Sequence, residues 1–154
     1  EEAERRGVRF TETREIQGDR FPATDFSISL SNPSSKIWAG TLSLDGYDPV
    51  LGIGFEFVSS NDMTAWVSPD GHSNSTVTSY DMKGTAERLA EAIPGTAVFY
   101  DPSADSNAVR FDSAGKDFEE ALQEYSAAQK ELMLEDLRAQ VRDFLDWLAA
   151  QGVI

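Results

Sequence analysis

The longest uninterrupted pattern in this chain is helical and runs from about 116 to 151. The stretch contains neither proline nor glycine, and Gly152 follows it at the position where a left-handed residue commonly ends a helix. With a rise of about 1.5 Å per residue, such a helix is roughly 50 Å long. Because the chain before it alternates in the manner of strands, the sequence predicts an α+β domain with this helix packed on a sheet.

Apolar residues form two stripes along this helix. The early stripe comprises Phe118, Leu122, Tyr125 and Leu132, and the late stripe comprises Leu134, Leu137, Val141, Phe144 and Leu148. At about 100° per residue, the late stripe is rotated by roughly 130° from the early one. Either the helix kinks near 127–130 and both halves join one core, or the first half seals the sheet while the second half docks a partner.

Acidic residues gather on the face opposite the early stripe, and Arg138 and Arg142 continue that face toward the helix end. Acids early and arginines late complement the helix dipole, and Glu135 and Asp146 are spaced to pair with these arginines. The same carboxylates also suit a basic partner. The candidate partner-binding residues are Glu120, Glu124, Glu131, Glu135, Leu137, Val141, Phe144, Trp147 and Leu148.

Short alternating runs precede the helix. They predict a mostly antiparallel sheet of about six to eight strands, and a short helix over about 85–93 that Pro94 and Gly95 end. The expected strands cover 8–16, 24–31, 36–45, 51–58, 63–68, 75–80, 96–100 and 108–112. No basic residue lies between Lys36 and Lys83, so we expect this half of the sheet to turn hydroxyls and carboxylates, including Glu56, toward solvent.

We expect residues 1–154 to form a single domain, in which 1–7 is a flexible N-terminal segment or a short helical turn. The chain has no cysteine, which excludes disulfides and thiolate metal sites. It shows no signal-peptide pattern and no apolar run of membrane-spanning length. We therefore expect a cytoplasmic protein without membrane insertion.

No enzyme motif emerges from the sequence. His72 is the single histidine and lies among turn formers, which disfavours a catalytic triad and a histidine-based zinc site. Gly52 and Gly54 lack the third glycine and the helix of a dinucleotide-binding fingerprint. The segment 101–112 spaces its oxygens like a calcium loop but has Ser106 where that loop needs glycine, which leaves calcium binding open. We expect no cofactor and no metal.

The net charge of −14 repels nucleic acid and anionic membranes and favours the capture of a basic protein. The sequence therefore predicts a non-enzymatic binding protein, in the form of an inhibitor or immunity-type protein that covers a basic site. One alternative is a chaperone or phage assembly protein that binds a partner, or its own copy, through the C-terminal helix. Another is a small-ligand or metal-dependent enzyme with a sheet cavity near Trp38, Phe55 and Trp66.

Overall fold

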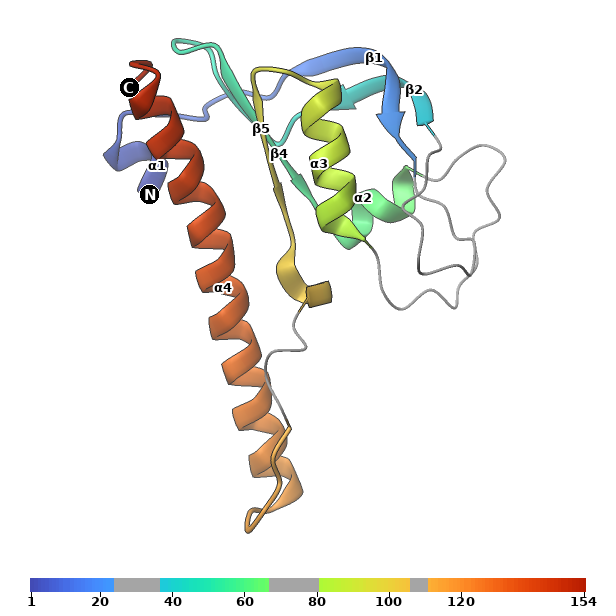
Figure 1. Ribbon diagram of the computed structural model, residues 1–154, viewed down its shortest axis with the longest axis vertical. Helices are drawn as coiled ribbons and strands as arrows, with labels where there is room; N and C mark the ends of the chain where they lie inside the picture. The colour runs from blue at the N-terminus through green and yellow to red at the C-terminus, as the bar shows by residue number, and fades with distance from the viewer. Residues whose placement is uncertain (24–36, 67–80, 106–110) are drawn as a thin grey trace.

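The computed structural model describes residues 1–23, 37–66, 81–105 and 111–154. Its elements are α1 (Glu2–Arg5), β1 (Glu15–Pro22), β2 (Ile37–Ser43), β3 (Gly46–Asp48), β4 (Ile53–Val58), α2 (Ser60–Ala65), α3 (Met82–Ala92), β5 (Thr96–Tyr100), the 3₁₀ helix η1 (Pro102–Asp105) and α4 (Phe118–Ala150). Figure 1 shows α3 and α4 on opposite sides of β4 and β5. The two chain ends lie near each other, where α1 meets the end of α4.

The described strands form two small sheets. β1 pairs with β2 in an antiparallel two-stranded sheet, and the second sheet has the order β3-β4-β5. β3 pairs antiparallel with β4, whereas β5 pairs parallel with it, because the connection through α2 and α3 returns the chain to the starting end of β4. The fold is α+β, as predicted. The expectation of one mostly antiparallel sheet of about six to eight strands was wrong.

The described part of the predicted strand 63–68 belongs instead to α2 and the residue that ends it. Ser59 caps this helix: its Oγ accepts the backbone N–H of Asp62, and Asp62 Oδ2 accepts the backbone N–H of Ser59 at 2.8 Å. This reciprocal capping begins a helical turn directly after β4 and outweighs the apolar alternation. The predicted strands 24–31 and 75–80, and most of 108–112, lie outside the described residues.

Other predicted elements are confirmed. β2 and β4 lie within the predicted strands 36–45 and 51–58, and β5 coincides with 96–100. α3 begins at Met82, three residues before the predicted start, because the side chain of Asp81 accepts the N–H of Gly84 and caps the helix there. α4 is continuous over its 33 residues, so both apolar stripes lie on one helix without the kink that was considered near 127–130.

Successive residues of β4 point to two faces of the three-stranded sheet. We call the face covered by α3 the α3 face, and the face under α4 the α4 face. The core of the α3 face is the larger one and comprises Phe21, Leu42, Leu44, Val58, Met63, Trp66, Met82, Ala86, Leu89 and Ile93. The core of the α4 face comprises Val8, Ile53, Leu145 and Leu148. Glu56 points to the α3 face and is 3% exposed, so the expectation that it faces solvent was wrong.

α4 is attached to the rest of the molecule at its C-terminal half. Gln140 Oε1 accepts the backbone N–H of Tyr100 at 3.0 Å, and Gln140 Nε2 donates to the carbonyl oxygen of Tyr100 at 3.2 Å. At the chain's start, Ala3 of α1 packs against the core of the α4 face, and Arg6 forms an ion pair with Asp146. Residues 1–7 therefore include the short helical turn that was considered for them.

Candidate binding site along α4

The two halves of α4 have different surroundings. In the C-terminal half, Leu145 and Leu148 are buried against Val8 and Ile53. The N-terminal half extends past η1 and away from both sheets (Figure 1). We call residues 111–136 the arm, because they comprise this half of the helix and the segment that leads into it.

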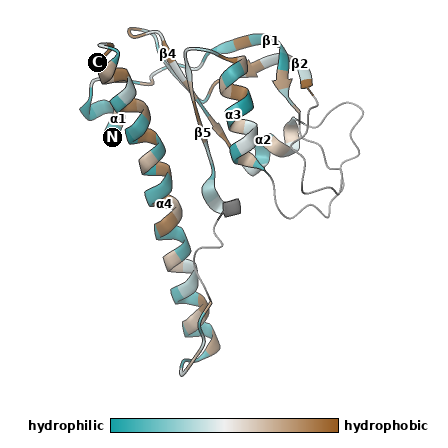
Figure 2. Ribbon diagram, viewed as in Figure 1, coloured by the Kyte–Doolittle hydropathy of each residue, from teal (hydrophilic) through white to brown (hydrophobic). Residues whose placement is uncertain are grey.

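Apolar side chains of the arm are exposed. The exposed fractions are 66% for Phe118, 47% for Leu122 and 42% for Leu134. Phe111, in the segment before α4, contacts the rings of Phe118 and Tyr125 with 5.9 and 5.7 Å between centroids. Apolar residues alternate with polar ones along the whole of α4 (Figure 2), and the arm extends away from both sheets (Figure 1). Phe118 and Leu122 group on the early stripe, whereas Leu134 lies on the late one, and grouped apolar residues at a surface mark interaction sites.

The arm is also strongly acidic. It contains eight acidic and two basic residues, which gives a net charge of −6. Glu124 pairs with Lys116, and this hydrogen bond raises the pKa of the lysine. Glu120 and Glu131 form no ion pair with any residue that the structure describes. The carboxylates of Glu120 and Glu131 are therefore available to the basic groups of another molecule.

Glu135 connects the arm to the packed half of α4. It accepts a hydrogen bond from Arg142 at 2.7 Å, and Arg138 Nη1 lies 3.8 Å from its other carboxylate oxygen. The hydrogen bond from Arg142 is the main cause of a pKa below the ordinary value for Glu135. Of the four candidate glutamates, Glu135 is thus the one held by two arginines of its own helix.

The sequence left two arrangements open for the halves of α4. In the structure the second half packs on the protein itself: Leu148 is buried, and Leu137, Val141 and Phe144 are half-buried. Trp147 is 56% exposed and stacks on Phe144 with 6.3 Å between ring centroids. Periodicity predicts which residues share a face of a helix, but it does not predict which half meets the sheet.

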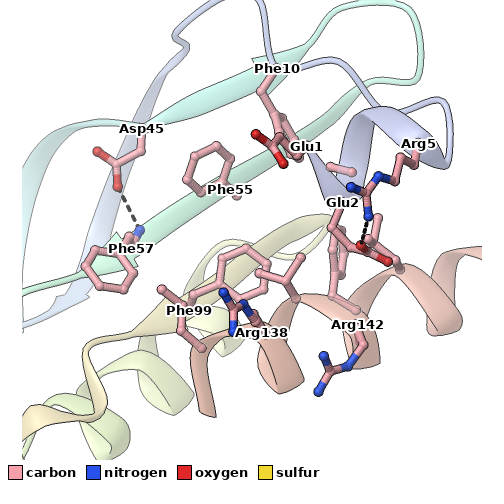
Figure 3. A pocket seen from close by; sticks show the side chains of 15 residues that line it. Glu1, Glu2, Arg5, Phe10, Asp45, Phe55, Phe57, Phe99, Arg138 and Arg142 are labelled. Atoms are coloured by element: carbon pink, nitrogen blue, oxygen red, sulfur yellow. Dashed lines mark hydrogen bonds and ion pairs between the residues drawn. The ribbon is translucent and has the colours of Figure 1, made fainter. Parts of the chain in front are cut away.

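A cavity of about 840 Å³ lies between the α4 face of the sheet and the second half of α4 (Figure 3). Its apolar lining comes from α1 and the segment after it, from β4 and β5, and from α4. These residues are Ala3, Phe10, Phe55, Phe57, Phe99, Leu137, Val141, Phe144 and Leu145. Four of the rings form a row, with centroid distances of 4.7 Å for Phe10–Phe55, 6.1 Å for Phe55–Phe99 and 5.8 Å for Phe99–Phe144. The volume lies in the range of small-molecule sites.

Charged side chains also line this cavity, and most of them are engaged within the protein. Arg5 donates to Glu2 at 3.4 Å, and Asp45 accepts the backbone N–H of Phe57 at 2.8 Å (Figure 3). The side chain of Arg138 is 63% exposed, and its ion pair with Glu135 is long at 3.8 Å. Arg138 is therefore the cavity-lining cation that a ligand can engage at the lowest cost in lost internal contacts.

One alternative considered from the sequence was an enzyme with a cavity near Trp38, Phe55 and Trp66, and the structure separates these residues. Phe55 lines the cavity on the α4 face. Trp38 and Trp66 instead pack with each other on the α3 face, with 6.5 Å between ring centroids. Residues on opposite faces of a sheet do not line one cavity, so only the Phe55 part of that prediction fits the structure.

Glu56 is a buried titratable group on the α3 face. Its Oε2 accepts the backbone N–H of Asp45 at 3.3 Å. Burial, and then the nearby carboxylates of Asp45 and Asp62, raise the pKa of Glu56 to about 8. Among the described residues, no group of three or more His, Cys, Asp or Glu side chains is placed to hold a metal ion. His72 and part of the 101–112 segment lie outside these residues.

Comparison with protein-family models, with curated proteins and with solved structures found no match for this chain. Across the described ranges, no helix is both long enough and apolar enough to cross a membrane.

Proposed function

We propose that this chain is a non-enzymatic, acidic protein-binding module that docks onto a basic region of another protein through its arm. The observation that carries this proposal is the exposure of Phe118, Leu122 and Leu134 on a helix half that extends away from the sheets. Burial of such side chains against a partner contributes about 25 cal/mol per Å² of apolar surface.

The charge of the arm defines the chemistry of the partner. The arm carries a net charge of −6 within a chain of −14, so its field attracts a basic surface and speeds the encounter. Nucleic acid has the same sign and is repelled. A second copy of the arm is also acidic, and pairing the two arms would bring their carboxylates together. This balance favours an inhibitor or immunity-type protein that covers a basic site on its partner.

A chaperone or assembly protein is the alternative that uses the same arm. Such a protein would depend mainly on the apolar side chains Leu122 and Leu134, and its binding would tolerate salt. An inhibitor of a basic site would depend on Glu120 and Glu131, and its binding would weaken as salt screens the charges. The cytoplasmic location expected from the sequence stays a prediction.

Affinity capture from a lysate of the source organism at low salt, followed by binding measurements with the purified partner, tests the proposal. The arm variant is Glu120→Gln with Glu131→Gln. The matched control is Glu87→Gln with Glu91→Gln on α3, since all four residues are exposed and both variants lose two charges. We expect the captured partner to be basic. We expect the arm variant to bind it about fivefold more weakly than the wild type, and the control variant to bind it with the wild-type affinity.

A second variant, Leu122→Gln with Leu134→Gln, tests the apolar part of the surface. We expect it to weaken binding at both low and high salt, with an unchanged melting temperature because both side chains are exposed. A partner that binds all variants equally, or a partner that is acidic, contradicts the proposal. Self-association of the wild type that this variant abolishes would support the assembly alternative instead.

A further inference from the structure

The cavity on the α4 face differs from the arm in both chemistry and location. Its lining is mainly phenylalanine, leucine and valine, and it lies beside the half of α4 that is attached to the sheet. The row from Phe10 to Phe144 runs from the sheet to α4, so aromatic rings line the cavity on both sides. A site of this size with nine apolar and six charged lining residues suits an elongated apolar molecule with a charged end.

The charged side chains that line the cavity decide which head group it can take. Three of them are cations and three are acids, namely Arg5, Arg138 and Arg142 beside Glu1, Glu2 and Asp45. Arg142 is held by Glu135 at 2.7 Å and Arg5 by Glu2 at 3.4 Å. Arg138 has only its 3.8 Å pair with Glu135, so its planar guanidinium can bind a carboxylate through two parallel hydrogen bonds.

We propose that the cavity binds a free fatty acid, with the acyl chain along the row of phenylalanine rings and the carboxylate on Arg138. The acyl chain removes from water the half-buried rings of Phe55 and Phe57, together with Val141 of α4. The carboxylate replaces the long pair to Glu135 with a short, charge-assisted contact. This inference does not rest on the proposed docking of the arm, because Glu120, Glu131, Leu122 and Leu134 do not line the cavity.

Calorimetric titration of the whole chain with dodecanoate, dodecanol and dodecylammonium tests the head-group assignment, since these probes share one alkyl chain. We expect dodecanoate to bind at one site, dodecanol about tenfold more weakly, and dodecylammonium most weakly of the three. The tenfold step is the loss of about one charge-assisted hydrogen bond. Tighter binding of dodecylammonium than of dodecanoate overturns the proposal, and so does binding at many equivalent sites.

Two substitutions place the ligand within the molecule. Arg138→Gln is expected to weaken dodecanoate binding about tenfold and to leave dodecanol binding unchanged. Lys130→Gln is the matched control, because it removes the same charge from the same helix at an exposed position outside the cavity lining. Val141→Phe fills part of the cavity and is expected to weaken both probes. If that variant does not fold, the Arg138→Gln result alone decides, and equal dodecanoate affinity in Arg138→Gln and wild type overturns the proposal.

Discussion

The two faces of the three-stranded sheet are made by the same strands but are covered to different degrees. On the α3 face, Leu89 of α3 and Val58 of β4 are buried in a core that the β1–β2 sheet completes, and Glu56 is buried beside them. On the α4 face, α4 is attached through Leu145 and Leu148, which pack against Val8, and through Gln140, which bonds the backbone of Tyr100, and a cavity opens beside Phe55. Neighbouring residues of β4 therefore lie in two different surroundings, a closed core on the α3 face and an open apolar cavity on the α4 face. The position of the covering helix, rather than the strand itself, determines which face is closed.

This comparison also explains why the charged residue of β4 lies on the better covered face. Apolar residues at Ile53, Phe55 and Phe57 led us to expect the core on their side. In the structure their side is the incompletely covered one, and Phe55 and Phe57 remain half-buried. Burial raises the pKa of Glu56, so this carboxyl group is neutral at neutral pH and its burial costs less than that of a charge.

The largest expected effect compares truncations on the two faces. Leu89→Ala removes a side chain that is 1% exposed in the α3-face core, and we expect a loss of about 3 kcal/mol in the free energy of unfolding. Val141→Ala removes a half-buried side chain beside an existing cavity, and about 1 kcal/mol is expected. Urea denaturation of both variants measures the difference. Equal losses would show that the two faces are packed alike.

The next effect concerns the pH dependence that Glu56 gives to the α3 face. Its pKa is about 8 in the folded protein against an ordinary 4.5. Between these values the folded state keeps the proton that the unfolded state has lost, so the contribution of Glu56 to stability is complete below about pH 4.5 and is lost as pH rises to about 8.

Glu56→Gln keeps a side-chain oxygen for the N–H of Asp45 and removes this titration. We expect the variant to gain stability relative to the wild type as the pH rises to 9, and the two proteins to converge near pH 4. Urea denaturation across this pH range gives the difference between the two proteins. A difference that stays constant with pH would contradict the burial of an uncharged Glu56.

A smaller effect tests the internal competition for Arg138 on the α4 face. Glu135→Gln removes the carboxylate that lies 3.8 Å from Arg138 and 2.7 Å from Arg142. With both arginines released, we expect dodecanoate to bind about threefold more tightly. Calorimetric titration measures this change, and Glu131→Gln is the control because Glu131 makes no ion pair within the described residues. Weaker binding in Glu135→Gln would contradict the assignment of the carboxylate to Arg138.

The smallest effect lies beyond the sheet, where α4 covers neither face. Leu122→Ala truncates a side chain that is 47% exposed on the arm, and we expect the free energy of unfolding to change by less than about 0.5 kcal/mol. Thermal unfolding compares this variant with Leu145→Ala, whose side chain is fully buried. A large loss in Leu122→Ala would mean that the arm is part of the core and is not a free docking surface.

The parts of the fold that the sequence predicts are those with strong local signals. Breakers and caps determine the ends of α3, and the long helical pattern before Gly152 identifies α4. α2 was missed because its signal is a pair of capping hydrogen bonds between Ser59 and Asp62 inside an apolar alternation. β3 was missed because it is three residues long.

The candidate site was predicted only in part, for a physical reason. Local periodicity groups residues such as Leu137, Val141 and Phe144 correctly on one side of α4. Which surface that side meets depends on contacts distant in sequence, such as those of Leu145 with Val8. The cavity and the burial of Glu56 both arise from such contacts, so neither could be read from alternation.

The two hydrogen bonds between Gln140 and Tyr100 have a consequence for association between chains. Among the strands that the structure describes, β5 is the last of its sheet, and a strand in that position offers unpaired backbone groups to any extended chain that approaches. Gln140 occupies the N–H and the carbonyl oxygen of Tyr100 with the same two bonds that an added strand would make. Attachment of α4 therefore covers the backbone groups of Tyr100, so an added strand could pair with this end of β5 only after α4 had moved away.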